Sequence, residues 1–265
     1  MPRFIAALAL LVLGTGCAPS RVAQRPGSPV VPVRLAPQVY ANAYLILGDR
    51  GPVVVDPGSD SEADARRLDA ALAAHGYGPD DVVLVVATHA HADHAGGVAR
   101  LQALGATVLA GAADTYAFEA GHNDTLHAIG PEAVFVRTVL IRDGSFPAVT
   151  PDLVLDAAPG HASIDLAPYG VRGEAVRLPG HTPGSIAVLL DGGEAIAGDV
   201  VRGGYMGGRA FRGRPLTHYF HDDRSEARAA VHALLRWGAQ RVYVGHGGPL
   251  EAARLRDWAD RPPPH

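Results

Sequence analysis

Three histidines and one aspartate lie within a six-residue segment, residues 89–94 (HAHADH). One residue, Thr88, separates this segment from Val82–Ala87, a continuous apolar run that is typical of a buried strand. A chain that turns away from a strand end can direct its first two histidines to one point, and the aspartate and third histidine to a second point close by. Imidazole nitrogen and carboxylate oxygen are ligands of zinc, and also of iron or manganese. The segment therefore predicts a metal site, with candidate ligands His89, His91, Asp93 and His94.

Four ligands do not fill two metal sites, so we expect further ligands from distant segments. Three short motifs offer them: residues 178–185 (LPGHTPGS), 197–199 (AGD) and 244–248 (VGHGG). Each follows or lies near the end of a predicted strand. Each also has glycine beside the candidate ligand, which allows close approach of the backbone. The candidates are His181, Asp199 and His246.

Composition excludes several other kinds of function. The chain has 265 residues, of which 48% are hydrophobic and 19% charged, and this composition is that of an ordered globular protein. The net charge of −4 argues against a nucleic-acid partner. All 23 basic residues are arginine, which excludes lysine Schiff-base chemistry, and a single cysteine excludes an intrachain disulfide.

The N-terminus has the pattern of a secretory signal. Arg3 precedes an apolar run of 10 residues, Phe4–Leu13, which is too short for the roughly 20 residues that span a bilayer. Small residues follow, and then Cys17, in an arrangement that resembles a bacterial lipobox. We expect a signal peptide at residues 1–16, a lipid-anchored Cys17 with a proline-rich tether at 17–35, and one domain at 36–265. The protein is then membrane-anchored on the periplasmic side of the bacterial envelope; a plain signal peptide is the alternative.

Strands and helices alternate along the remaining chain without an internal repeat, and sheets covered by helices would bury this pattern. The predicted helices are Ser61–His75, Val98–Leu104, Ala112–Ala120, Arg224–Trp237 and Glu251–Trp258. The predicted strands, besides Val82–Ala87, are Val39–Leu47, Val53–Val55, Thr107–Leu109, Val134–Ile141, Ala175–Leu178, Ile186–Leu190, Ala195–Ile196 and Arg241–Val244.

With these motifs the chain resembles the metallo-β-lactamase-fold hydrolases over roughly residues 39–250. The resemblance implies an αββα sandwich with a dinuclear site along one edge. It implies that one zinc ion is held by His89, His91 and His181, that the second is held by Asp93, His94 and His246, and that Asp199 bridges the two. In this ligand set the chain resembles glyoxalase II and the homoserine-lactone-type lactonases. Metallo-β-lactamases, by contrast, generally use Cys or Ser at the bridging position.

The reaction that the resemblance implies is hydrolysis of an ester, lactone or thioester bond of a small molecule by a hydroxide shared between two metals. Asp93 is the candidate catalytic residue, because it can orient this hydroxide and take up its proton. β-Lactam or phosphodiester hydrolysis at the same site is the alternative. An alternative of another class is an envelope lipoprotein that binds a metal or ligand without turnover.

Other residues are candidates for supporting roles. Asp56 either supports a ligating histidine or forms a turn with the Pro-Gly that follows it. Substrate contacts are expected from residues 111–150, as an insertion on the active-site side. They are also expected from the glycine-rich segment 200–223, which is either a lid or an ordinary surface loop. The substrate-binding candidates in this second segment are Tyr205, His218 and His221.

Overall fold

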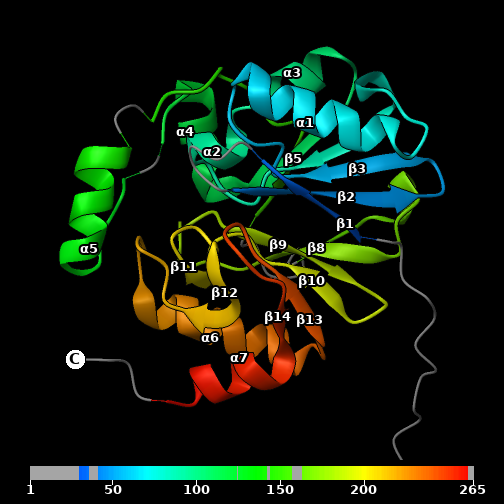
Figure 1. Ribbon diagram of the computed structural model, residues 1–265. Coiled ribbons are helices and arrows are strands. Elements are labelled where there is room, and N and C mark those ends of the chain that lie inside the picture. The colour runs from blue at the N-terminus through cyan, green and yellow to red at the C-terminus, as the bar shows by residue number, and fades with distance from the viewer. Residues whose placement is uncertain (1–29, 36–40, 124, 142–143, 157–162, 262–265) are drawn as a thin grey trace, which may run out of the picture.

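The computed structural model describes residues 30–35, 41–123, 125–141, 144–156 and 163–261. Within these residues the chain forms two six-stranded sheets that pack face to face, with helices on the outer face of each (Figure 1). This is the expected αββα sandwich. None of the helices in this part of the chain is long and apolar enough to cross a membrane.

The N-terminal sheet has the strand order β1-β2-β3-β4-β5-β6. Its strands are β1 (Val30–Arg34), β2 (Asn42–Gly48), β3 (Gly51–Val55), β4 (Leu84–Val86), β5 (Thr107–Gly111) and β6 (Leu153–Leu155). The strands from β3 to β6 are parallel, so they end at the same edge of the sheet. Helices α1 (Glu62–Ala73) and α3 (Val98–Ala103) cover the outer face (Figure 1). The side chain of Ser61 caps α1 by accepting a hydrogen bond from the Asp64 N–H.

The C-terminal sheet has the order β14-β13-β10-β9-β8-β7. Its strands are β7 (Ser163–Asp165), β8 (Gly173–Arg177), β9 (Ile186–Leu190), β10 (Glu194–Ile196), β13 (Arg241–Tyr243) and β14 (Leu250–Glu251). Helices α6 (Arg224–Arg236) and α7 (Ala252–Ala259) cover its outer face. Asp223 caps α6 by accepting from the N–H groups of Ser225 and Glu226.

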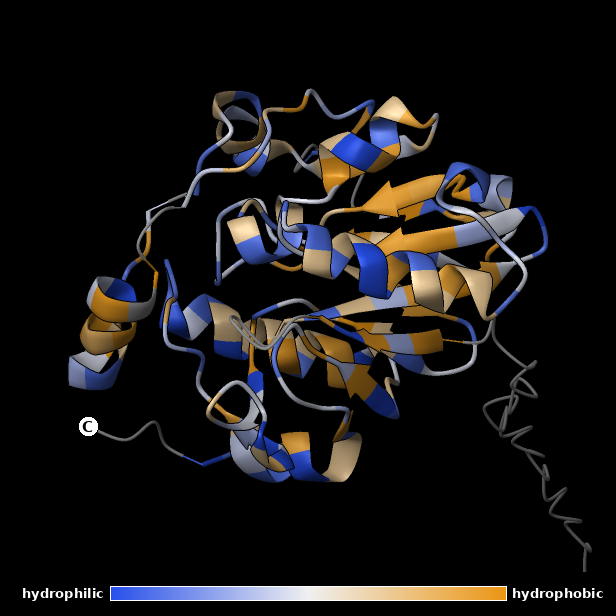
Figure 2. Cartoon of the chain, turned by 45° about the horizontal axis from the view of Figure 1, so that its top comes forward, coloured by the Kyte–Doolittle hydropathy of each residue, from blue (hydrophilic) through white to orange (hydrophobic). Residues whose placement is uncertain are grey.

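Three apolar clusters hold the layers together. Figure 2 shows that the strands are mainly hydrophobic, whereas the helices outside them alternate between hydrophobic and hydrophilic residues. One lies between the N-terminal sheet and its helices and includes Phe118, and another lies between the C-terminal sheet and its helices. The cluster between the two sheets includes Ile46, Val86, Ile186 and Ile196. Both faces of the central strands are therefore buried, which explains their continuous apolar sequences.

The structure corrects two sequence-based expectations. Val30–Arg34 is not tether but the edge strand β1, and Val33 is buried in the core. Pro32 fits there because a proline is tolerated on an edge strand. The segment Val134–Ile141 is not a strand: α5 (Gly130–Phe135) continues into a π-helix, η3 (Val136–Leu140). Pro131 occupies the first turn of this helix, where a proline costs no hydrogen bond.

Short elements complete the described chain: η1 (Pro79–Asp81), α2 (Ala92–Ala95), η2 (Ala112–Asp114), α4 (Thr115–Ala120) and η4 (Ala167–Tyr169). Part of the segment 200–223 forms a two-stranded hairpin of β11 (Arg202–Tyr205) and β12 (Ala210–Leu216). The expected signal peptide and Cys17 lie outside the described residues.

Candidate metal centre

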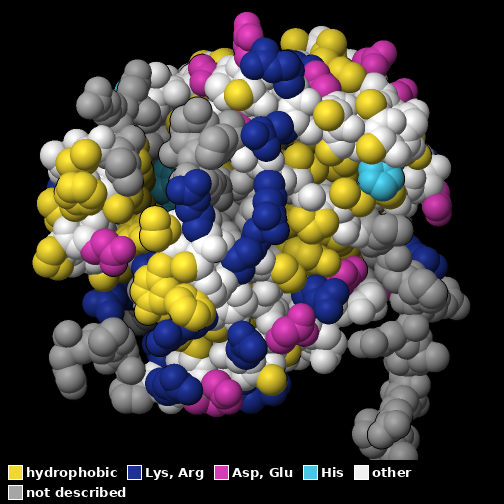
Figure 3. All heavy atoms as spheres, viewed as in Figure 1, with side chains coloured by type: hydrophobic (Ala, Val, Ile, Leu, Met, Phe, Trp, Pro, Cys, Tyr) yellow, Lys and Arg dark blue, Asp and Glu magenta, His cyan; other side chains and the backbone are white. Residues whose placement is uncertain are grey.

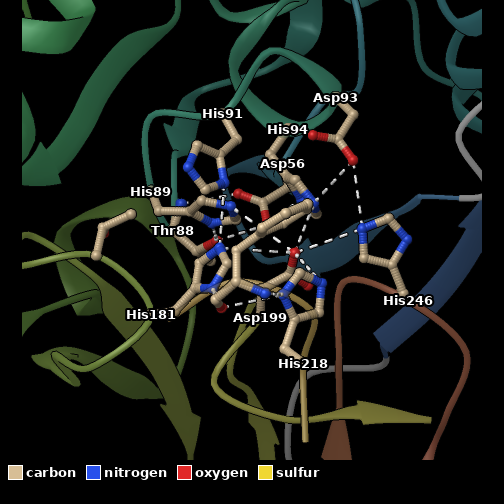
Figure 4. A network of polar contacts seen from close by, with 12 residues as sticks. Asp56, Thr88, His89, His91, Asp93, His94, His181, Asp199, His218 and His246 are labelled. Atoms are coloured by element: carbon tan, nitrogen blue, oxygen red, sulfur yellow. Dashed lines mark hydrogen bonds and ion pairs between the residues drawn. The ribbon is translucent and has the colours of Figure 1, made fainter. Parts of the chain in front are cut away.

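All seven predicted ligands meet at one end of the two sheets. Figure 4 shows their side chains pointing toward one another around Asp199. His89–His94 follow β4 in the N-terminal sheet, while His181, Asp199 and His246 follow β8, β10 and β13 in the C-terminal sheet. The convergence that the sequence motifs predict is therefore present, and each half of the sandwich contributes to it.

One carboxylate oxygen lies at the centre of the cluster. Asp199 Oδ2 is within 4 Å of Nε2 atoms from five histidines. The distances are 3.9 Å to His89, 3.4 Å to His94, 3.8 Å to His181, 3.2 Å to His218 and 3.4 Å to His246. Asp199 is 3% exposed. A single carboxylate thus faces both groups of predicted ligands, which is the position that a bridging ligand requires.

The first ligand group consists of His89, His91 and His181, whose donor atoms lie within 4.8 Å of one another. Hydrogen bonds orient two of these rings. His181 donates from Nδ1 to the Phe220 carbonyl oxygen at 2.8 Å. His89 Nδ1 lies 3.0 Å from Thr88 Oγ1. Since each Nδ1 is engaged outside the cluster, each Nε2 directs its lone pair into it.

The second ligand group consists of Asp93, His94 and His246, again within 4.8 Å. Asp56 orients His94, because its Oδ2 accepts from His94 Nδ1 at 3.1 Å. The same carboxylate accepts from the Thr88 N–H and the Thr88 hydroxyl, both at 2.7 Å. Of the two interpretations of Asp56, the structure favours the supporting role.

The charges of the cluster favour a cation. Burial opposes protonation of His94, but Asp93 and Asp199 outweigh it and raise its pKa well above the usual value. Burial also opposes protonation of His246, but the charge of Asp199 outweighs burial and raises the pKa of His246 to about 9. In the first group, burial lowers the pKa of His89, and the neighbouring imidazoles lower it further. The carboxylates thus favour positive charge at this place, and a metal ion that supplies it binds the imidazoles in their neutral form.

The donor set therefore fits metal ions. Among the described residues, the buried atoms His89 Nε2, His94 Nε2 and Asp199 Oδ1 have no hydrogen-bond partner. Buried polar atoms are almost always paired, so atoms of this kind grouped around one carboxylate indicate ligands. Nitrogen and oxygen donors of this kind suit zinc, iron and manganese alike.

A buried carboxylate that no sequence motif indicates, that of Asp114, joins the loops of the first ligand group. Asp114 is fully buried; its Oδ1 accepts from the Gly184 N–H at 2.7 Å. Its Oδ2 accepts from the Thr182 hydroxyl at 2.7 Å and from the Ala90 N–H at 3.2 Å. Asp114 follows β5, which is parallel to β4. This shared sheet edge is the signal that could have identified it.

The three substrate-binding candidates have different surroundings. His218 and His221 are buried, at 5% and 4% exposure, rather than lying along an open mouth. His218 belongs to the cluster itself, since its ring stacks on His246 with 5.6 Å between centroids. Tyr205 is 37% exposed, and its ring contacts are with Phe211 and nearby arginines of the hairpin. The described contacts therefore bring His218 to the site but not Tyr205.

The segment 111–150 reaches the rim of the cluster, as expected. Asn123 Oδ1 accepts from the Ala92 N–H at 2.7 Å, within the ligand motif. Ile129 N–H donates to the Tyr219 carbonyl oxygen at 2.9 Å, next to the segment that holds His181. Helix α5 itself stands apart from the two sheets (Figures 1 and 2).

Comparison with known proteins agrees with this geometry. The Metallo-beta-lactamase domain-containing protein 1 of Rattus norvegicus is 48% identical over 65 residues, which cover 24% of this chain and 25% of that protein. The match to the Homo sapiens protein of the same name is 48% over 56 residues, covering 21% and 20%. The chain thus spans about a quarter of the length of these curated relatives.

Solved structures match over much longer stretches. A metallo-beta-lactamase family protein from Thermus thermophilus is 22% identical, with a TM-score of 0.60 over 89% of this chain and 79% of that chain. BLEG-1 B3 metallo-beta-lactamase is 20% identical, with a TM-score of 0.60 over 86% and 97%. TTHA1623 in a di-iron-bound form is 26% identical, with a TM-score of 0.57 over 85% and 96%.

The family model of the metallo-beta-lactamase superfamily matches residues 36–246, which include every predicted ligand. The fold, the ligand motifs and this match lead to one conclusion. The chain belongs to the metallo-beta-lactamase superfamily, whose members are generally hydrolases.

Proposed function

We propose that this protein is a hydrolase with two zinc ions that cleaves an ester, lactone or thioester bond of a small molecule. The observation that carries the proposal is the position of Asp199 Oδ2, within 4 Å of histidine nitrogens from both ligand groups. A binding protein has no need of such a shared carboxylate. Iron is the main alternative metal, since TTHA1623 is known in a di-iron-bound form.

Bound metal ions of this kind lower the pKa of water to about 7 and polarise a carbonyl oxygen. The residues of the chain would hold these ions, orient the attacking water and accept its proton. Asp93 is the ligand-group residue with the most exposed side chain, at 23%, and its Oδ2 lies 3.3 Å from His246 Nε2. Although burial opposes its ionisation, His94 and His246 hold the pKa of Asp93 below its usual value, so it is ionised at neutral pH. We assign to Asp93 the orientation of the attacking water and acceptance of its proton.

His218 has a positioning role in this proposal. Its Nε2 lies 3.2 Å from Asp199 Oδ2, on the side where His181 and His246 also approach. Burial lowers the pKa of His218 to about 3, so its imidazole is neutral at physiological pH. A neutral ring packed against His246 limits the movement of Asp199 and closes this side of the cluster to solvent.

Metal analysis combined with a substrate screen tests the proposal. Zinc-loaded protein is expected to contain two ions per chain and to hydrolyse an ester, lactone or thioester. A chelator should abolish the activity and lower the melting temperature, because bound ions stabilise only the folded state. β-Lactam and phosphodiester substrates in the same screen test the alternative reactions. Fewer than one ion per chain after loading would contradict the dinuclear site.

We also propose that the protein is exported and attached to the membrane through Cys17. The supporting pattern is the apolar run Phe4–Leu13 with small residues before the single cysteine. Since Val30–Arg34 belongs to the domain, the tether between anchor and domain is residues 18–29. Cell fractionation of wild type and Cys17→Ser tests this. We expect wild type in the membrane fraction and Cys17→Ser in the soluble fraction; the same distribution for both would exclude the anchor.

A further inference from the structure

Four arginines line a hollow of about 420 Å³ at the same end of the sandwich as the metal centre. They come from segments far apart in sequence: Arg34 ends β1, Arg67 lies in α1, and Arg209 and Arg212 belong to the hairpin of β11 and β12. The described residues that line the hollow include no acidic side chain. Figure 3 shows arginine side chains running down the front of the molecule across the two halves.

The hollow shares a wall with the loop that carries His246. The Asn42 amide donates to the Gly247 carbonyl oxygen at 3.0 Å, and Arg212 Nη2 donates to the same oxygen at 3.4 Å. Gly208 packs directly on this loop, since a Cβ at Gly208 would lie 2.2 Å from the Gly247 Cα. A molecule in the hollow is therefore next to a loop that holds a predicted metal ligand.

Among the described residues, the charges of Arg67 and Arg212 are not paired with a carboxylate, unlike those of several other arginines. Arg66, Arg100 and Arg241 pair with Glu62, Asp69 and Glu251. By contrast, Arg67 and Arg212 bond backbone carbonyl oxygens.

Arg212 is half-buried, so its charge is partly desolvated. Burial, and then the charge of Arg34, lower the pKa of its guanidinium. Like charges held together from separate elements attract an anion, and guanidinium groups bind carboxylate and phosphate oxygens in pairs of hydrogen bonds.

We propose that this arginine pocket, formed by Arg34, Arg67, Arg209 and Arg212, binds an anionic group of the substrate, a carboxylate, phosphate or sulfate. The scissile bond of the same molecule then lies at the metal centre, beyond the His246 loop. This inference rests on the proposed hydrolase function and narrows it: the substrate is a small ester, lactone or thioester that carries a negative charge remote from the reacting bond.

A binding measurement tests the pocket without relying on activity. Sulfate is titrated calorimetrically into metal-loaded protein at constant ionic strength, for wild type, the double variant Arg34→Gln/Arg67→Gln and the control Arg66→Gln. Arg66 is the neighbour of Arg67 on α1 but pairs with Glu62 outside the pocket. Arg212 is left in place because it also bonds the His246 loop. We expect sulfate affinity to fall about tenfold in the double variant and to stay at the wild-type value in the control. Equal affinity in all three proteins would overturn the proposal.

A kinetic measurement tests the link to the substrate. Each active ester or thioester is compared in two forms, one with a terminal carboxylate and one with that carboxylate methylated. We expect wild type to prefer the charged form, and the ratio of the two kcat/KM values to fall about tenfold in Arg34→Gln/Arg67→Gln but less than about twofold in Arg66→Gln. No preference in wild type would overturn the substrate assignment while hydrolysis itself stands. If no substrate is hydrolysed, the proposed function fails, and the sulfate titration still decides whether the pocket binds anions.

Discussion

Asp199→Asn is expected to lower hydrolytic activity by more than about 100-fold and to reduce the metal content from two ions per chain toward one. Asparagine keeps the shape of aspartate but removes the negative charge that faces histidines from both ligand groups. Loss of that charge weakens the attraction for both ions, and an amide bridges two cations poorly. Activity on the best substrate and metal content by mass spectrometry are the measurements.

The fold should survive this change, because asparagine has the size and shape of aspartate and its amide oxygen can still accept from a nitrogen such as His218 Nε2, which lies 3.2 Å from Asp199 Oδ2. The control is Asp257→Asn on the exposed surface of α7, which should behave as wild type. The experiment also separates an enzyme from a non-catalytic binding protein. Retained ligand binding, with no turnover in wild type or variant, would favour the binding protein.

Asp114→Ala is expected to destabilise the protein by about 3 kcal/mol or more, because two buried backbone N–H groups lose their acceptor. For a domain of this size, that loss corresponds to a melting temperature lower by roughly 6–12 °C. The loops that carry His91 and His181 also lose their common anchor, so affinity for the first metal should fall at least about tenfold. Thermal unfolding of chelated protein and zinc titration measure the two effects separately.

Asp152→Ala is the matched control. Asp152 also accepts a hydrogen bond from a backbone N–H of β5, that of Val108 at 2.8 Å. Asp152 is exposed, however, and Val108 lies near the start of β5, whereas Asp114 follows the end of this strand. We expect it to cost at most about 1 kcal/mol and to leave zinc affinity unchanged. Wild-type stability and zinc affinity in Asp114→Ala would show that the bonds of Asp114 do not support the site.

The ligands were predictable because their chemistry is local. In the segment His89–His94, residue type and spacing alone indicate metal ligands. The glycines beside His181 and His246 indicate that the backbone can approach closely there, which supports the same prediction. Asp114 was not predictable in the same way. Its partners Thr182 and Gly184 lie 68 and 70 residues away, and only the shared edge of parallel strands brings them together.

The errors in secondary structure have a similar origin. Val134–Ile141 is rich in β-branched residues, which favours a strand, but none of the strands in the described part of the chain pairs with it. Pro131 at the start of α5 and hydrogen bonds within the segment favour a helix instead. The side chains of Val134 and Phe135 are exposed on this helix. In Val30–Arg34 the proline suggested a tether, yet pairing with β2 and burial of Val33 outweigh that local preference.

The division of the ligands between the two sheets has a thermodynamic consequence. His89 and His94 belong to the N-terminal half, and Asp199 and His246 belong to the C-terminal half. An ion held by both halves binds only while the sheets lie face to face, so its binding free energy adds to the work of separating them. The apolar contact between the sheets and the ion at their edge thus oppose the same opening motion. Partial unfolding that begins at this edge becomes rarer as the free metal concentration rises.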